Sequence, residues 1–276
     1  MKAELYSTDG KSTKKIDLPS QFIEPVRPDI IKRAVLAVQS SRIAPYGAYS
    51  EAGKRHSSII SKRRRDYKTT YGKGISRTPR KVMTKRGSQF SWMGATVRFT
   101  VGGRRAHPPK PGKIHNIKVN SKERKKAIRS ALAATLDIDL VRKRGHRINN
   151  LVPVIDSKIE NISKTSEVKK ILLSLNLKEE LSRTQQKKIR AGRGKSRGRK
   201  YKTKIGPLIV VSKACSLEKA SYNIPGLEVC RITNLNAEKL APGTVPGRFT
   251  IFTESSLKVM HDKKLFLDNK KKIGKK

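Results

Sequence analysis

The sequence predicts an α/β domain with a mostly parallel sheet, together with a long extended internal loop and a short basic tail. The domain is predicted because short apolar runs alternate with segments of helical period along most of the 276 residues. The loop is predicted because residues 43–113 keep no helical period and are rich in Gly, Ser, Thr, Arg and Lys. The tail, residues 263–276, is basic and is expected to be disordered.

The N-terminal residues predict a β-hairpin followed by a helix. Strand-like residues on both sides of Asp9-Gly10 favour a hairpin turn at that dipeptide. Pro28 suits the first position of a helix. The apolar stripe of this helix continues from Ile30 to Val38 and fades at Ser40-Ser41.

Two further helices and one strand are predicted in the middle of the chain. Asn120 and Glu123 have the spacing of a capping box at a helix start. Thr165 is expected to cap a helix whose apolar residues recur at helical spacing. Residues 151–155 predict a strand, although Pro153 weakens that prediction.

The last third of the chain alternates three strands with three helices. Strands are predicted at residues 208–211, 228–232 and 249–252, and helices at residues 216–222, 236–240 and 254–262. This alternation favours parallel strands, because they need crossover connections. We therefore expect one discontinuous globular domain, residues 1–42 and 114–262, with the loop as an insertion.

The charge of the chain is high and uneven. Its formal net charge is +44, and residues 54–110 hold 17 Lys and Arg against one acid, while residues 187–204 hold 10 and no acid. Such an excess repels itself unless a polyanion neutralises it. Nucleic acid fits better than a membrane surface, because no helix sets large apolar residues opposite a basic face. No membrane partner is expected, and the N-terminus lacks the apolar core of a signal peptide, so a cytoplasmic location is expected.

The internal loop is expected to be an arm that leaves the domain and threads into RNA. Each limb has about 35 residues, which gives an upper reach of about 110 Å at roughly 3.3 Å per residue. Aromatic residues such as Phe90 and Trp92 lie between its cations, and they suit stacking on unpaired bases while Arg clamps phosphates. The alternative is a disordered basic linker of unspecific affinity, which is less favoured because such linkers contain few aromatic residues.

Residues 187–204 form a second basic segment. Gly194-Lys195-Ser196 resembles the end of a phosphate-binding loop, but the position five residues earlier is Ile189 where that motif needs Gly. A glycine-rich RNA-binding segment is therefore predicted, and nucleotide hydrolysis is not. Over the whole chain, the residues expected to contact RNA are Arg55, Lys62, Arg63, Arg64, Arg65, Lys73, Arg77, Arg80, Lys81, Lys85, Arg86, Arg98, Arg104, Arg105, His107, Arg144, His146, Arg147, Arg190, Arg193, Lys195, Arg197, Arg199 and Lys200.

The sequence predicts no catalytic site, no metal site and no cofactor. Asp137 and Asp139 could hold a metal, but no third ligand is near in sequence, and a helix end with two solvated acids is favoured. The histidines lack metal-ligand spacing. His107 and His146 lie beside Arg-rich runs and are expected to join RNA contacts.

Seven motifs spread along the chain carry a family resemblance. They are residues 127–135 (AIRSALAAT), 143–147 (KRGHR), 190–195 (RAGRGK), 223–226 (NIPG), 240–243 (LAPG), 247–249 (GRF) and 252–256 (FTESS). Together they resemble the universal large-subunit ribosomal protein four family. The RAGRGK segment is similar to the archaeal and eukaryotic branch, and the short length favours an archaeal member.

The resemblance implies a three-layer α/β/α domain and a structural role in the large ribosomal subunit. The implied partners are large-subunit rRNA, neighbouring ribosomal proteins, and the nascent polypeptide at a loop tip that lines the exit tunnel. Residues 106–110 match the motif that ends the arm in this family, which puts the tip between Arg80 and Trp92. The tip is bulkier here than in the glycine-richer family pattern. Its candidate residues are Lys81, Lys85, Arg86, Gln89, Phe90 and Trp92.

Two other functions remain open from the sequence. An RNA-modifying enzyme would need a cofactor loop after a strand, and the sequence contains none. A free RNA-binding regulator is the second alternative. An enzyme should be soluble and active alone, whereas a chain of this charge should need RNA or salt to stay in solution.

Overall fold

The computed structural model describes residues 1–268, and the chain divides into two compact units. The globular unit consists of residues 1–42 and the chain from Ile117 onward. The arm is residues Ile43–Asn116, three residues longer at its C-terminal end than the predicted loop. Within the described residues, no helix has the length and apolar character needed to cross a membrane.

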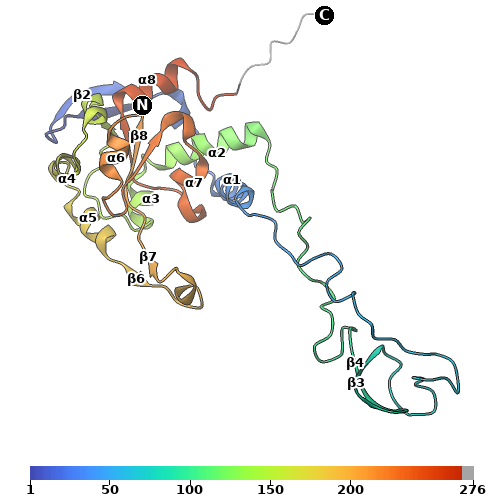
Figure 1. Ribbon diagram of the computed structural model, residues 1–276. Helices are drawn as coiled ribbons and strands as arrows, with labels where there is room; N and C mark the ends of the chain where they lie inside the picture. The colour runs from blue at the N-terminus through green and yellow to red at the C-terminus, as the bar shows by residue number, and fades with distance from the viewer. Residues whose placement is uncertain (269–276) are drawn as a thin grey trace, which may run out of the picture. The chain divides into compact units, whose positions relative to one another are not determined.

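A six-stranded sheet forms the centre of the globular unit, in the order β2-β1-β5-β10-β8-β9 (Figure 1). Its strands are β1 (Lys2–Tyr6), β2 (Ser12–Asp17), β5 (Val154–Ile155), β8 (Leu208–Val211), β9 (Glu228–Arg231) and β10 (Thr250–Thr253). β1 and β2 pair antiparallel as the predicted hairpin, and the other neighbours pair parallel. The predicted α/β class with a mostly parallel sheet is therefore confirmed.

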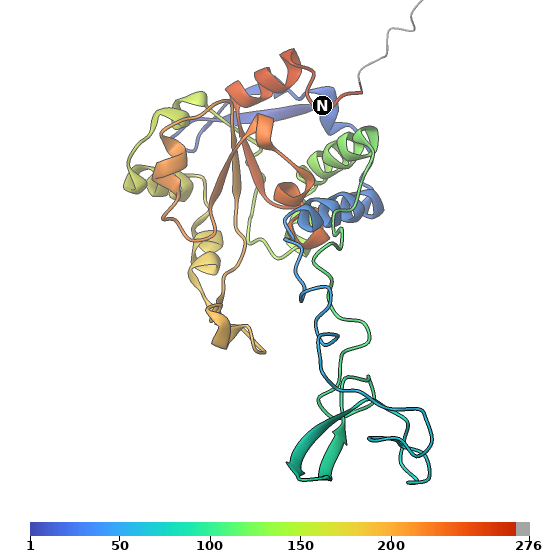
Figure 2. The same ribbon diagram turned by 45° about the vertical axis from the view of Figure 1, so that its right-hand side comes forward.

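Helices cover both faces of this sheet. They are α1 (Pro28–Ser41), α2 (Ser121–Ala134), α3 (Ile138–Lys143), α4 (Thr165–Ser174), α5 (Lys178–Gln185), α6 (Leu217–Ser221), α7 (Ala237–Leu240) and α8 (Glu254–Asp262). Alternate strand residues divide the core: Leu208 and Val210 pack with α1, α2, α7 and α8, whereas Ile209 and Val211 pack with α3 to α6. The result is a three-layer α/β/α sandwich, with α1 and α2 together on one side of the sheet in Figure 2.

Local sequence explains most helix boundaries. Pro28 occupies the first turn of α1, and the Thr253 hydroxyl accepts a hydrogen bond from the backbone N–H of Ser256 at the start of α8. The two predicted side-chain caps are wrong, because neither Asn120 nor Thr165 makes a capping hydrogen bond. At α2 the Glu123 carboxylate instead binds Arg33 of α1 at 3.0 Å, so it ties two helices together.

Several elements were not predicted. The helices α3 and α5 are short, and the strands β6 (Lys188–Ile189) and β7 (Tyr201–Lys202) contain only two residues each. In the arm, β3 (Arg80–Arg86) and β4 (Gln89–Gly94) form an antiparallel hairpin where no regular structure was expected. The predicted strand at residues 151–155 shortens to β5, because Pro153 has no N–H to donate.

The first residues of the predicted basic tail pack onto the globular unit. Gln21 donates a hydrogen bond to the carbonyl of Leu265 at 2.9 Å, and Arg129 donates one to the carbonyl of Phe266 at 2.7 Å. Residues 263–268 are therefore part of the folded unit. Residues 269–276, the remainder of the predicted tail, lie outside the described residues.

Candidate nucleic-acid interface

The β3–β4 hairpin lies at the predicted loop tip. Arg86 pairs with Gln89 across the turn, where Gly87 adopts a φ of +58° that favours glycine. The pairing shifts between Val82 and Thr84, which marks a β-bulge in β3. The candidate tip residues therefore lie on one two-stranded hairpin, and four of them, Lys81, Lys85, Arg86 and Gln89, are exposed.

Three aromatic rings form a cluster beside this hairpin. The ring centroids of Phe90 and Trp92 are 5.1 Å apart, and those of Tyr67 and Phe90 are 5.4 Å apart, both in edge-to-face geometry. The Lys73 ammonium lies 5.7 Å from the Trp92 ring centroid, and the Arg80 guanidinium lies at the same distance. Phe90 and Trp92 are half-buried among one another and these cations, so only part of each ring is free to meet another molecule.

Other predicted arm cations lie in loops that backbone and side-chain contacts hold in place. Asp66, the acid between residues 54 and 110, accepts hydrogen bonds from the Ser61 hydroxyl and the Tyr67 N–H, and these bonds hold its pKa below the usual range. The Arg55 guanidinium lies 4.4 Å from the Tyr49 ring centroid. The remaining exposed members of the predicted set are Lys62, Arg63, Arg64, Arg65, Lys73, Arg77, Arg98, Arg105 and His107, while Arg80 and Arg104 are half-buried.

The basic segment 187–204 projects as a two-stranded ribbon formed by β6 and β7. Its loop closes on itself, because the Arg190 N–H donates to the Lys200 carbonyl and the Arg190 side chain donates to the Arg199 carbonyl. Gly198 takes a φ of +75°, which lets the chain turn back after a short 3₁₀ segment, Lys195–Arg197. Arg193, Lys195, Arg197, Arg199 and Lys200 are exposed, as the predicted RNA-binding segment requires, and Arg190 is half-buried.

Gly194-Lys195-Ser196 does not have the setting of a nucleotide-binding loop. Its 3₁₀ segment spans only residues 195–197 and is followed by a turn and β7, whereas that motif needs a strand before the loop and a long helix after it. Asp137 likewise has a structural role: its carboxylate accepts hydrogen bonds from the N–H groups of Asp139 and Leu140 and caps α3. Within residues 1–268, no three His, Cys, Asp or Glu side chains gather as metal ligands.

His146 lies inside the globular unit rather than on its surface. Its side chain is 2% exposed, and its Nδ1 lies 2.6 Å from an oxygen of Glu180, which is fully buried. Glu180 also accepts hydrogen bonds from the Arg183 side chain at 2.7 and 2.8 Å and from the Arg147 N–H at 2.9 Å. Contact between His146 and RNA, as predicted from its basic neighbours, does not fit this internal pairing.

His146, Glu180 and Arg183 form a hydrogen-bonded triad, and burial shifts the pKa values of His146 and Glu180. Burial alone would raise the pKa of Glu180, but the hydrogen bonds from Arg183, His146 and Arg147 lower it to about 2. Burial lowers the pKa of His146, against the opposing effect of Glu180, so the imidazole is neutral at pH 7. This pairing could not be predicted from the sequence, because Glu180 is 34 residues from His146.

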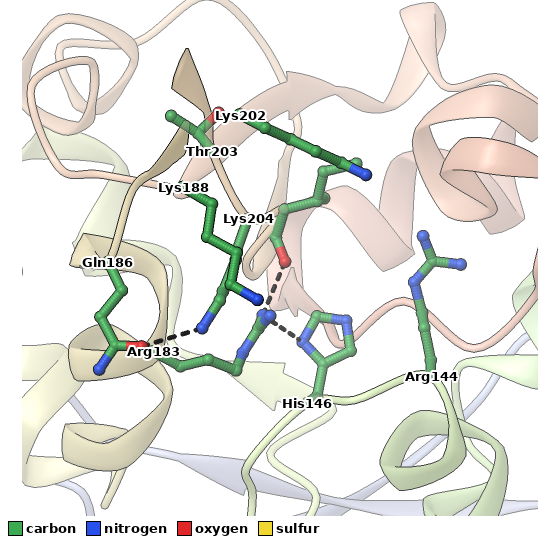
Figure 3. Close-up of a pocket in the computed structure, with 9 residues that line it drawn as sticks. Arg144, His146, Arg183, Gln186, Lys188, Lys202, Thr203 and Lys204 are labelled. Carbon is green, nitrogen blue, oxygen red and sulfur yellow. Dashed lines mark hydrogen bonds between the residues drawn. The ribbon is translucent and has the colours of Figure 1, made fainter. Parts of the chain in front are cut away.

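Figure 3 shows a pocket lined by His146 and Arg183, with Arg144 beside His146 and side chains of the β6–β7 ribbon near Arg183. Arg144 is half-buried and donates hydrogen bonds to the carbonyls of Pro242 and Val245. Of the three predicted contacts in this region, Arg144 lines the pocket and Arg147 is exposed. Lys188, Lys202 and Lys204, which also line it, belong to the predicted basic segment 187–204 but were not among the individual contacts expected, and Arg183 lies outside that segment.

Comparison with known proteins identifies the family. Residues 16–263 match the ribosomal protein L4/L1 family. The chain is 47% identical to the large ribosomal subunit protein uL4 of Nanoarchaeum equitans over 96% of this chain and all of that protein. It is 41% identical to the protein of the same name from Methanosphaera stadtmanae, over 98% of this chain and 99% of the other. A third archaeal relative of that name, from Methanococcoides burtonii, is 42% identical over 92% of this chain and 96% of its own length. As the motifs predicted, this chain belongs to the ribosomal protein L4/L1 family and resembles its archaeal members.

Proposed function

We propose that this chain is a structural constituent of the large ribosomal subunit that binds large-subunit rRNA through its arm and its β6–β7 ribbon. Membership of a family of ribosomal proteins supports the structural role and speaks against an enzyme. The proposed location is the large subunit in the cytoplasm. The proposed partners are rRNA, neighbouring ribosomal proteins and, at the arm tip, the nascent polypeptide.

One observation carries the RNA-binding part of the proposal: the cations of the arm and the ribbon lack acidic partners. Among the described residues, Arg55 is the one cation of segment 54–110 that forms an ion pair, with Glu51 at 3.8 Å. Within residues 1–268, none of the ten Lys and Arg of residues 187–204 forms an ion pair. Elsewhere in the globular unit, buried and half-buried cations such as Arg129 and Arg248 are bound to carboxylates. The two basic segments therefore keep their charge for an external polyanion.

RNA phosphates would supply the negative charge that balances these cations. Each phosphate that Lys or Arg neutralises releases condensed counterions, which favours binding in proportion to the number of contacts. The exposed arginines of the arm loops and of the ribbon can each clamp a phosphate with two parallel hydrogen bonds. Ordering the arm costs conformational entropy, and these contacts offset that cost. The arm would then join separate RNA segments, which gives it a role in subunit assembly.

At the arm tip, the β3–β4 hairpin is proposed to line the nascent-polypeptide exit tunnel. A hairpin whose Phe90 and Trp92 pack with Tyr67 should be stiffer than an open loop. It would therefore keep a fixed position in the tunnel wall. Its exposed residues Lys81, Lys85, Arg86 and Gln89 would face rRNA or the passing peptide.

Sucrose-gradient sedimentation tests the structural role. A tagged copy of the chain is expressed in an archaeal host, the lysate is separated at low and at high salt, and the fractions are blotted. We expect the chain to migrate with the large subunit and to remain there at high salt, because many phosphate contacts must break together. A chain that stays at the top of the gradient would refute the proposal.

Crosslinking tests the tip. Large subunits carrying Gln89→Cys are treated with a cysteine-directed crosslinker while they hold a stalled nascent chain. The control is Lys169→Cys on α4, which is exposed on the globular unit. We expect a nascent-chain adduct with Gln89→Cys and none with Lys169→Cys. Equal yields from both variants would argue against a tunnel position for the hairpin.

A further inference from the structure

A pocket of about 430 Å³ opens where the base of the β6–β7 ribbon meets α5 and the segment after α3. Its walls combine cations from three separate parts of the chain: Arg144 after α3, Arg183 on α5, and the ribbon lysines Lys188, Lys202 and Lys204 (Figure 3). His146, Gln186, Thr203 and Ile205 complete the lining. No acidic side chain is among the lining residues, so the pocket is strongly positive.

The charge of Arg183 is already balanced within the protein. Both oxygens of the buried Glu180 accept hydrogen bonds from its guanidinium, which also donates to the Ile205 carbonyl at 2.7 Å. Arg183 is thereby fixed in place next to His146. It forms a rigid floor for the pocket and adds little net charge of its own.

The other four cations are not balanced. Lys204 donates to the neutral amide oxygen of Gln186 at 3.0 Å, and Arg144 donates only to backbone carbonyls. Within the described residues, none of Arg144, Lys188, Lys202 and Lys204 forms an ion pair. Four positive charges thus converge on one recess without a carboxylate to neutralise them.

Arg144 shows the electrostatic consequence. Burial, together with the nearby positive charges of Arg248 and Arg183, lowers the pKa of Arg144 to about 10. By contrast, the more deeply buried Arg248 has the carboxylate of Glu228 at 2.7 Å. An anion in the pocket would give Arg144 the partner that it lacks, and it would relieve repulsion among all four cations.

We propose that this pocket binds one backbone phosphate of large-subunit RNA, held by Arg144, Lys188, Lys202 and Lys204. A guanidinium has five N–H donors, and Arg144 uses one on each terminal nitrogen for a backbone carbonyl, so three remain for phosphate oxygens. The lysines provide point charges on flexible stems that can follow the backbone. The pocket is open enough for a phosphate within a continuous strand. The inference rests on the proposed function and deepens it, because it assigns a defined phosphate site at the foot of the ribbon, apart from its exposed loop.

The salt dependence of RNA binding by the full chain tests the site. The pocket variant is Lys188→Gln/Lys202→Gln/Lys204→Gln. The matched control is Lys169→Gln/Lys170→Gln/Lys213→Gln, which removes the same charge from exposed lysines outside the pocket. The probe is large-subunit rRNA transcribed in vitro. Each lost phosphate contact reduces the slope of log K against log salt by about 0.7–0.9.

Protection from an arginine reagent gives a second readout that requires no variant. Wild-type protein is treated with phenylglyoxal alone, with the rRNA transcript, or with inorganic phosphate at the same ionic strength, and the modification of Arg144 is measured by mass spectrometry. Arg231, which is paired with Glu218 at 2.6 Å outside the pocket, serves as the internal control. We expect RNA to protect Arg144 selectively.

The outcomes separate the inference from the proposed function. We expect the pocket variant to reduce the slope by about 0.7–0.9 relative to the control, which corresponds to one lost phosphate contact, with an affinity loss on the order of tenfold at 0.1 M salt. Equal slopes for the two variants, or unprotected Arg144 in the RNA complex, would overturn the pocket alone. Protection by inorganic phosphate as strong as by RNA would also overturn it, because the site would then serve a free anion. Failure of the wild-type chain to bind the transcript would contradict the proposed function itself.

Discussion

Replacing Glu180 with Gln should destabilise the globular unit by about 3 kcal/mol at pH 7. The carboxylate accepts four hydrogen bonds, from His146, from the Arg183 guanidinium twice, and from the Arg147 N–H. Its side chain is fully buried, so solvent does not screen these contacts. A Gln amide keeps one acceptor oxygen, but its NH₂ group would face the N–H donors of Arg183, His146 or Arg147. The substitution also leaves Arg183 without a counter-charge.

The magnitude follows from the acidity of Glu180. A folded pKa of about 2, against 4.5 for a free Glu, corresponds to about 3 kcal/mol of stabilisation at pH 7. Because the folded pKa lies below the unfolded one, this contribution is complete above about pH 4.5 and is lost as the pH falls toward 2. The difference between wild type and Glu180→Gln should therefore shrink to about 1.5 kcal/mol at pH 3.

Urea unfolding followed by circular dichroism, at constant salt and at several pH values, measures both quantities. The matched control is Glu179→Gln, the same substitution one residue earlier on α5, where the side chain is exposed. We expect the control to change the free energy of unfolding by less than about 0.5 kcal/mol. A Glu180→Gln variant as stable as the control, or a destabilisation that does not shrink as the pH falls, would refute the reasoning.

Three further variants test other parts of the structure. Glu160→Gln should cost about 2 kcal/mol in unfolding free energy, because the Glu160 carboxylate accepts hydrogen bonds from Ser212, which follows β8, and from Thr253, the last residue of β10. Gly226→Ala should cost about 3 kcal/mol, because Gly226 has a φ of +79° and a Cβ would lie 2.6 Å from Thr184. Phe90→Ala should shift the fluorescence emission of Trp92 to longer wavelength, because Trp92 loses a neighbouring ring.

Controls and contrary outcomes for these variants come from the same chain. For Gly226, the control is Gly243→Ala, where φ is +75° but nothing lies within 4 Å of an added Cβ, and a cost of about 1 kcal/mol is expected. Equal losses at both glycines would contradict the steric argument. Trp92 is the only tryptophan, so its emission reports the arm directly, and the exposed Phe99→Ala is the control. A Glu160→Gln variant of wild-type stability would show that the hydroxyls reorient at no cost.

Elements with clean periodicity and clear boundaries could be predicted from the sequence. The helix α1 begins at Pro28 and ends at Ser41 because its apolar stripe is regular and proline marks its start. The strand β8 is a four-residue apolar run that is buried on both faces, as a central parallel strand must be. In both elements, local composition and tertiary packing favour the same structure.

Elements that depend on distant partners were missed. The helix α5 has the charged Glu180 on its buried side, where it pairs with His146. This charged residue interrupts the apolar pattern by which the helix could have been predicted. The strand β3 consists mostly of polar residues, and in β4 the apolar alternation is carried chiefly by Phe90 and Trp92, which is too short a pattern to predict a hairpin. The side chains of Arg183, Lys188 and Lys204 meet in one pocket only after α5 and the ribbon have folded.

Charge pattern alone located the basic segments, but it could not separate surface cations from internal ones. His146 lies in a run of cationic residues, and the sequence therefore predicted an RNA contact. Its ring is buried because the loop after α3 is hydrogen-bonded to Glu180 of α5, a contact between segments that are distant in the sequence. Arg147, the next residue, is exposed, so two neighbouring residues that the charge pattern treats alike differ in their access to solvent.

The strand order has a consequence for the timing of folding during synthesis. The strand β10, at residues 250–253, pairs with β5 on one side and with β8 on the other, so it joins β2-β1-β5 to β8-β9. Until the ribosome has translated those residues, the two halves of the sheet share no strand. The arm and the β6–β7 ribbon are both synthesised earlier. We therefore expect nascent chains stalled before residue 250 to expose their basic segments while the globular unit is still sensitive to protease, and chains stalled well beyond β10 to become resistant. Under the proposed function, RNA would therefore bind the basic segments before the globular unit folds.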